Sequence, residues 1–206
     1  MTAEDFFTDD MTGDRVDIER SIELYQMELE NFVNQHQEED LQDAPFEVQN
    51  EAGFLLCTLG KNFYLIEDYA TAAEYFETGL AFNLNVQDEY VIEMALGYGF
   101  ALINSEQGRT GVVLEAVADD FEYLADFCFM MGMVYLESKQ YEQAVVEFAK
   151  ATEGEEHKLD GAGSYLSYYY AGIAREKQNR PAEAREFFAK AAPQYQKAAN
   201  KLQKYS

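Results

Sequence analysis

The chain has 206 residues, of which 48% are hydrophobic and 30 are aromatic, 15 Tyr and 15 Phe. This apolar content is enough for a packed core and excludes an intrinsically disordered chain. The formal net charge is −24, so we expect neither nucleic acid nor a membrane surface as a partner. Because only three prolines interrupt a sequence rich in helix formers, the expected fold class is all-α.

The charge is unevenly distributed along the chain. Residues 1–50 carry 15 acidic and 2 basic side chains, residues 51–100 carry 8 and 1, and residues 101–150 carry 9 and 3. Residues 151–206 reverse the balance, with 7 acidic and 9 basic side chains. An acidic front and a basic rear favour head-to-tail pairing between copies, so a homo-oligomer is one hypothesis for the function.

The first 13 residues lack a sustained period and are predicted to form a flexible acidic arm. Asp9, Asp10 and Asp14 lack the alternating oxygen ligands and the closing glutamate of a calcium loop, so we predict no metal site there. The N-terminus is acidic, unlike a signal peptide, and no run approaches 18 apolar residues. A cytoplasmic location is therefore expected.

Residues 14–40 are predicted to form an N-terminal amphipathic helix. Its apolar positions follow alternating steps of four and three residues: Ile18, Ile22, Tyr25, Leu29 and Phe32. We expect this helix to cover the open end of a helical array. A coiled-coil dimer seam is the alternative, although about three heptads is short for one.

Three later segments repeat the same landmark residues at the same offsets. The first contains Gly60, Phe63, Tyr69, Ala72, Phe76 and Gly79. The second contains Gly132, Tyr135, Tyr141, Ala144, Phe148 and Ala151, and the third contains Gly172, Arg175, Pro181, Ala184, Phe188 and Ala191. Identical spacing in three places is hard to obtain by chance, and it indicates a repeated pair of helices.

This frame resembles the tetratricopeptide repeat (TPR), a helix–turn–helix unit of about 34 residues. The resemblance implies a right-handed solenoid of about four repeats within a single domain, residues 14–206. The predicted boundaries are repeat 1 at 46–84, repeat 2 at 87–119, repeat 3 at 122–153, repeat 4 at 161–192 and a C-terminal capping helix at 193–206. Repeat 2 is degenerate, because its second half lacks the alanine and aromatic landmarks.

Repeat 3 is followed by a glycine-rich and acidic loop, EGEEHKLDGAG. Glu153, Glu155, Glu156 and His157 are a formal candidate for a cation site. A single histidine among scattered carboxylates is weak support for one. We therefore predict a solvated loop without a metal.

The sequence contains no motif for catalysis or for a cofactor. Phosphate-binding, dinucleotide-binding, serine-hydrolase and zinc-protease patterns are all missing from it. Cys57 and Cys128 fall in equivalent helices two repeats apart, so we expect both to be reduced and mostly buried. We predict a protein that is not an enzyme and that needs no cofactor.

The resemblance also implies a concave binding groove lined by the first helix of each repeat. Carried onto this sequence, the lining is Cys57, Lys61, Tyr64, Met94, Tyr98, Phe129, Met133, Tyr169 and Ile173. These side chains are mostly apolar or aromatic, so the expected partner is an apolar or basic peptide or an amphipathic helix. Two alternatives stay open: the same side chains form core between repeats, or the chain fills the groove itself.

The order of segments is similar to that in the TPR tail of some bacterial family 2 glycosyltransferases. The likeness covers about residues 17–200 and lies in segment character, for example in VIEMALGYGFALINSEQ and GSYLSYYYAGIAREKQNR. It implies an accessory module that engages substrate for such a transferase. The leading hypothesis is a non-catalytic scaffold for protein–protein interaction, with oligomerisation and this accessory role as the alternatives.

Overall fold

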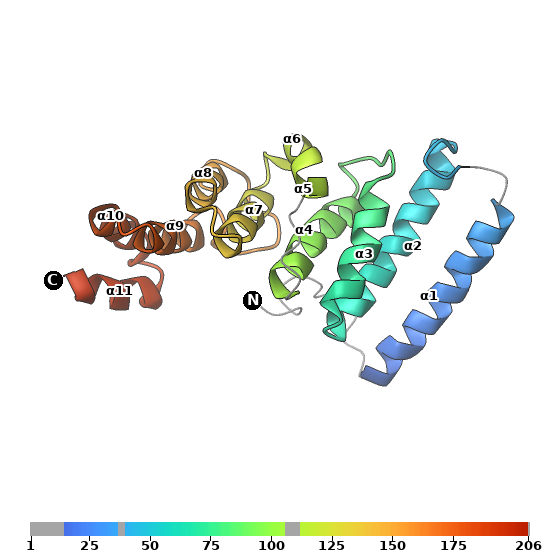
Figure 1. Cartoon of the computed structure of the whole chain (residues 1–206), viewed down its shortest axis with the longest axis horizontal. Coiled ribbons are helices and arrows are strands. Elements are labelled where there is room, and N and C mark those ends of the chain that lie inside the picture. The colour runs from blue at the N-terminus through green and yellow to red at the C-terminus, as the bar shows by residue number, and fades with distance from the viewer. Residues whose placement is uncertain (1–14, 37–39, 106–111, 206) are drawn as a thin grey trace. The chain divides into compact units, whose positions relative to one another are not determined.

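The computed structural model describes residues 15–36, 40–105 and 112–205 (Figure 1). The predicted arm at residues 1–13 lies outside this part. The regular secondary structure of the described residues is helical, without a strand, and the helices form packed adjacent pairs. The expected all-α fold class, built from helical pairs, is therefore confirmed. The chain divides into two compact units, Met1–Val117 and Ala118–Ser206.

The described part of the first unit forms five helices. They are α1 (Arg15–Gln35), α2 (Phe46–Leu65), α3 (Tyr69–Leu80), α4 (Glu89–Asn104) and the short α5 (Val112–Ala116). Helix α2 packs against α1 and α3, and α4 packs against both α2 and α3 (Figure 1). Helix α5 is only five residues long, which agrees with the missing landmarks in that part of the sequence.

The second unit begins with one helical turn, α6 (Ala118–Phe121), and continues with two full helical pairs. These are α7 (Ala125–Glu137) with α8 (Tyr141–Ala151), and α9 (Tyr165–Lys177) with α10 (Pro181–Ala191). Helix α8 also packs against α9, which joins the two pairs. Helix α11 (Gln196–Leu202) and a final 3₁₀ turn, Gln203–Tyr205, pack at the end of this unit.

The repeated glycine and phenylalanine of each frame are in contact. A Cβ atom on Gly60 would lie 2.5 Å from the ring of Phe76, and one on Gly132 would lie equally close to Phe148. Gly172 has the same relationship to Phe188, at 2.6 Å. The missing side chain therefore lets the two helices of a pair approach until the ring fills the space between them.

The turn inside each pair repeats as well. Glu67, Lys139 and Asn179 each lie seven residues after the landmark glycine, and all three have a positive φ, between 59° and 67°. In each case the next residue donates a backbone hydrogen bond to a carbonyl five residues earlier, as Gln140 does to Tyr135 at 2.8 Å. This left-handed residue ends the first helix and turns the chain into the second.

Helix α1 packs on α2 through the apolar face that its sequence predicts. Phe32 is buried against Ala52 and Leu55 of α2, and Tyr25 and Leu29 pack against the same cluster. Its opposite face exposes three large apolar side chains: Val16, Leu24 and Met27. The structure thus gives α1 the covering role on α2 and leaves an apolar stripe uncovered.

The loop after α8 is anchored by a buried carboxylate. Asp126, in the first turn of α7, is fully buried and accepts hydrogen bonds from the backbone N–H groups of His157, Lys158 and Leu159 at 2.7–3.0 Å. The side chains of Glu155 to Lys158 stay exposed, as expected for a solvated loop. The backbone of this loop is nevertheless fixed to α7, which the sequence did not reveal.

The C-terminal segment is held on the second unit by aromatic packing and by one carboxylate. Glu176 of α9 accepts hydrogen bonds from Lys201 and, at 2.6 Å, from the hydroxyl of Tyr205. Burial opposes ionisation of Glu176, but these two partners outweigh it and lower its pKa. The ionised carboxylate therefore helps the end of the chain to stay on α9.

Candidate binding face on α2 and α4

Among the described residues of the first unit, the large aromatic side chains with the greatest exposure lie on α2. Phe46 is 46% exposed and Phe54 is 49% exposed. They are eight residues apart on one helix, so their Cα atoms lie about 12 Å apart on the same side. With Lys61 of α2 and with Tyr90 and Glu93 of α4, they define what we call the α2–α4 face.

Tyr90 connects the two helices of this face. Its ring packs edge to face on Phe54, with 5.7 Å between the ring centroids. Its hydroxyl donates a hydrogen bond to Oδ1 of Asn50 at 2.7 Å. Burial raises the pKa of this hydroxyl to about 12, with smaller contributions from Asp88 and Cys57. Tyr90 is therefore neutral at physiological pH and acts as a fixed hydrogen-bond donor.

The single cation of the α2–α4 face is paired with a carboxylate. Nζ of Lys61 lies 2.7 Å from Oε2 of Glu93, and both side chains are largely shielded from solvent. This pair closes one end of the face and links α2 to α4. Because the carboxylate of Glu93 neutralises the charge of Lys61, the net charge near the face is set by the neighbouring carboxylates.

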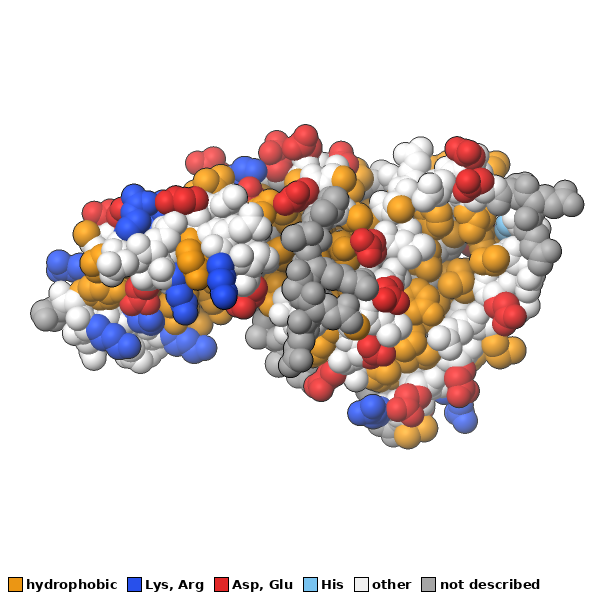
Figure 2. All heavy atoms as spheres, in the orientation of Figure 1, with side chains coloured by type: hydrophobic (Ala, Val, Ile, Leu, Met, Phe, Trp, Pro, Cys, Tyr) orange, Lys and Arg blue, Asp and Glu red, His pale blue; other side chains and the backbone are white. Residues whose placement is uncertain are grey.

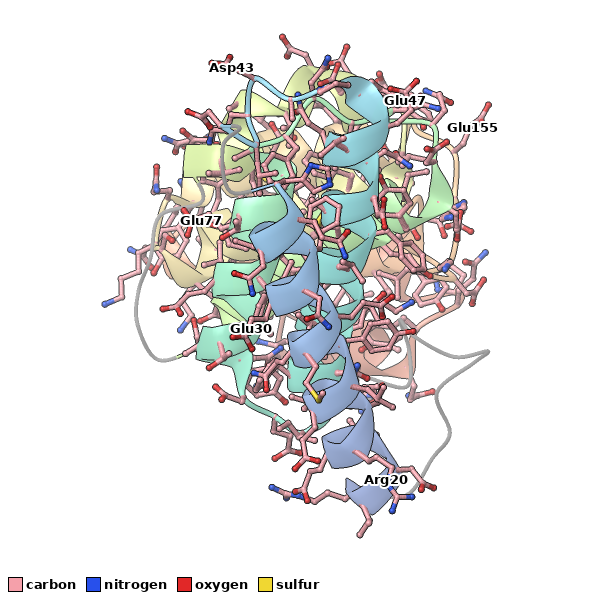
Figure 3. All side chains as sticks on the ribbon, turned by 90° about the vertical axis from the view of Figure 1, so that its right-hand side faces the viewer. Arg20, Glu30, Asp43, Glu47, Glu77 and Glu155 are labelled. Atoms are coloured by element: carbon pink, nitrogen blue, oxygen red, sulfur yellow. The ribbon has the colours of Figure 1, made fainter. Side chains whose placement is uncertain are left out.

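Those carboxylates surround the aromatic side chains. Glu47 and Glu51 are exposed on α2, seven and three residues before Phe54, and these spacings place them beside it. Glu89 is exposed at the start of α4. Figure 3 shows Glu47 pointing outward near the first turn of α2, with Asp43 in the preceding loop. The α2–α4 face is therefore apolar at its centre and acidic around it.

The nine residues predicted to line a groove occupy different environments. Five of them are buried: Cys57, Tyr64, Met94, Tyr98 and Phe129. Cys57 contacts the backbone oxygen of Tyr90 through its sulfur at 3.2 Å, and the Tyr64 hydroxyl accepts a hydrogen bond from Asn104. These side chains point toward the next helix and not toward solvent, so they do not line an accessible surface.

Phe129 and Met94 are buried for a similar reason. Phe129 lies between the rings of Phe148 and Tyr170, with 5.7 Å between centroids in each case. Met94 packs its sulfur against Gly79 of α3. Both side chains therefore pack between helices in this structure.

The other four predicted residues keep some exposure. Lys61 belongs to the α2–α4 face, and Met133 is half-buried on α7. Tyr169 and Ile173 are half-buried on α9 and belong to the cluster that includes Tyr195. The rings of Tyr169 and Tyr195 meet edge to face, with centroids 4.9 Å apart. On α9 the chain's own C-terminal segment therefore covers part of the predicted lining.

Sequence reasoning missed Phe46, Phe54 and Tyr90. The lining carried over from the repeat family includes Cys57, whereas Phe54, three residues earlier on α2, is the exposed side chain. The missed signal is the pair Phe46 and Phe54 at a spacing of eight residues, close to two helical turns. Neither phenylalanine is one of the repeated landmark residues, so both are candidates for the surface.

Neither metal ligation nor membrane insertion is indicated where the chain is described. In residues 15–36, 40–105 and 112–205, no group of three or more His, Cys, Asp or Glu side chains is arranged to hold a metal ion. Within the same residues, no helix has the length and apolar character to cross a membrane. Both cysteines are free and buried, as expected. Burial, followed by the charge of Glu147, raises the pKa of Cys128 to about 12.

Comparison with known proteins identifies one segment. A family model described as tetratricopeptide repeat matches residues 125–153, which are helices α7 and α8 with their turn. Neither the curated proteins nor the solved structures contain a match to the chain. The resemblance to glycosyltransferase tails therefore stays a prediction. The packed helical pair of α7 and α8 is thus similar to a tetratricopeptide repeat.

Proposed function

We propose that this protein is a non-catalytic scaffold that binds a peptide or a helix of a partner protein on the α2–α4 face. The observation that carries the proposal is the exposure of Phe46 and Phe54, about half of each side chain, on a helix of a repeat fold. Apolar groups exposed together on a folded domain mark sites of association. Helical repeats of the kind matched at residues 125–153 present such faces to protein partners.

The geometry of the face fits a short segment better than a flat protein surface. Two aromatic side chains about 12 Å apart match the spacing of anchor residues two turns apart on an amphipathic helix. The hydroxyl of Tyr90 is positioned between α2 and α4 by its bond to Asn50. In the second unit, considered by itself, Met133 stays a separate candidate contact residue, because it is half-exposed on α7.

The proposal is tested by affinity capture with matched variants. Phe54→Ser and Phe46→Ser remove the apolar anchors, and Val146→Ser is the control, because Val146 is 53% exposed on α8 and lies outside the face. We expect partners captured by the wild-type chain to be lost with the two phenylalanine variants and kept with the control. Equal capture by all four proteins would reject the α2–α4 face as the binding site.

A second candidate function is self-association, which the charge distribution favours. Residues 1–117 carry 25 acidic and 4 basic side chains, whereas residues 118–206 carry 14 and 11. Lysine and arginine side chains gather over α9, α10 and α11 (Figure 2). Light scattering over a series of salt and protein concentrations tests this function, and a monomer under all conditions rejects it.

A further inference from the structure

We propose that the segment recognised by the α2–α4 face is a basic amphipathic helix of a partner protein. The inference rests on the proposed function and adds the chemistry of the ligand. It requires two properties of the partner at once: apolar side chains that cover Phe46 and Phe54, and lysine or arginine side chains that meet the surrounding carboxylates. Each requirement follows from a separate feature of the face.

The requirement for a basic partner comes from the acidic composition of the first unit. A net charge of −21 on residues 1–117 disfavours an acidic partner over this whole unit. Close to the aromatic pair, Glu47 and Glu51 are exposed on α2 and no basic residue precedes Lys61 on that helix. The charge of Lys61 itself is compensated by Glu93 at 2.7 Å. A basic ligand is therefore attracted by these carboxylates, and α2 presents no uncompensated cation to repel it.

The apolar requirement distinguishes a specific ligand from any polycation. Phe54 is backed by the ring of Tyr90, so its exposed side is held in one orientation. A ligand that carries charge alone would leave both phenylalanine side chains in contact with water. An amphipathic helix covers them with one face, while its lysine or arginine side chains extend toward the flanking glutamates.

Two sources within this chain fit the face less well. Residues 1–13 contain four carboxylates and no cation, so the charge of the face repels them. A second copy offers exposed basic side chains on α9, α10 and α11, although three others, Arg175, Arg180 and Lys201, pair with Glu142 and Glu176 of the same unit. Among the described residues of these three helices, no large hydrophobic side chain is exposed.

The experiment uses four labelled peptides of 18 residues with the full-length protein. Three share one amphipathic leucine pattern and carry lysine, glutamine or glutamate on the polar face, and the fourth scrambles the lysine and leucine positions. Fluorescence anisotropy gives each affinity at low and at moderate salt. We expect the lysine peptide to bind about tenfold more tightly than the glutamine peptide and than the scrambled peptide, with a smaller advantage at the higher salt.

Matched variants connect the affinity to the face. Glu47→Gln with Glu51→Gln should weaken the lysine peptide about fivefold and leave the glutamine peptide unchanged. Phe54→Ser should weaken both peptides. Glu186→Gln, which removes an exposed carboxylate of α10, should change neither. Thermal unfolding of each variant verifies that the fold is retained.

The possible results separate the inference from the function on which it rests. If the glutamine peptide binds as tightly as the lysine peptide and Phe54→Ser weakens both, the proposed function stands and the basic character of the partner is rejected. If no peptide responds to Phe54→Ser, both proposals fail. If light scattering shows a dimer that Phe54→Ser dissociates, the occupant is a second copy and the inference is overturned.

Discussion

The ring of Phe148 occupies the space that a side chain on Gly132 would need. A Cβ atom at Gly132 would lie 2.5 Å from the ring, and Phe148 is itself fully buried, so the ring has no free space to enter. We expect Gly132→Ala to introduce about 3 kcal/mol of strain, against a gain of about 1 kcal/mol in helix propensity. Denaturant unfolding should therefore show a net loss of about 2 kcal/mol.

A double-mutant cycle tests whether the ring is the cause. Phe148→Leu alone should destabilise the second unit, because it leaves a cavity beside Gly132. Combined with Gly132→Ala, the same change should cost less, because the smaller side chain makes room for the new methyl group. Additive effects of the two substitutions would contradict direct contact as the source of the strain.

The sequence predicts the helical pairs well because their determinants are local. Each landmark glycine and its phenylalanine are 16 residues apart, within one helix–turn–helix unit. This fixed spacing therefore predicts the contact between Gly132 and Phe148. The all-α fold follows from three such frames. The segment of α5 lacks these landmarks, and the helix there is short, Val112–Ala116.

The accessible face was harder to predict, because it depends on how one helical pair packs on the next. Cys57 and Phe54 are three residues apart on α2 and both contact Tyr90 of α4, yet Cys57 is buried and Phe54 is half-exposed. The anchoring of the loop at His157 by Asp126 spans 31 residues and follows no repeated offset. Neither relationship can be read from spacing in a single sequence.

Lys139 holds a left-handed backbone conformation that a non-glycine residue adopts at a cost. Its φ is 61°, and it ends α7. Lys139→Gly should raise the free energy of unfolding by about 0.5–1 kcal/mol, because glycine removes the steric penalty. Ser138→Gly is the adjacent control: its φ is −75°, so glycine there should lower stability by about the same amount. The same sign for both substitutions would contradict the assignment.

The two cysteines should resist modification in the folded protein. Cys57 and Cys128 are each 1% exposed, and the pKa of Cys128 is raised to about 12. At pH 8 the Cys128 thiol is therefore protonated as well as inaccessible. A chromogenic disulfide reagent should detect no fast-reacting thiol in native buffer and two thiols in denaturant. Fast reaction of one thiol under native conditions would show local opening of its helix.

Asp126 should control the order of the loop that follows α8. Asp126→Ala removes the acceptor of three backbone N–H groups, one of which belongs to the buried residue Leu159. We expect a loss of about 3 kcal/mol in stability. Amide exchange at His157 to Leu159 should accelerate more than exchange in α10. Unchanged exchange at these three residues would mean that other contacts hold the loop.

Glu176 should make the second unit sensitive to acid. Its pKa is lowered in the folded state, because the hydrogen bonds from Lys201 and Tyr205 outweigh the opposing effect of burial. A carboxyl group with a lowered pKa stabilises the fold above its unfolded pKa, about 4.3, and this contribution is lost as the pH falls through the folded pKa. Glu176→Gln should therefore cost about 1 kcal/mol at pH 7 and almost nothing at pH 2.

The measurement is urea unfolding of the wild type and of Glu176→Gln at a series of pH values between 7 and 2. The difference between the two proteins should shrink as the carboxylate becomes protonated. Glu186→Gln is the control, because Glu186 is exposed on α10. The effect of Glu186→Gln on the free energy of unfolding should therefore stay small at every pH. A constant difference between wild type and Glu176→Gln at every pH would show that the contacts of Glu176 stabilise α11 through packing and not through its charge.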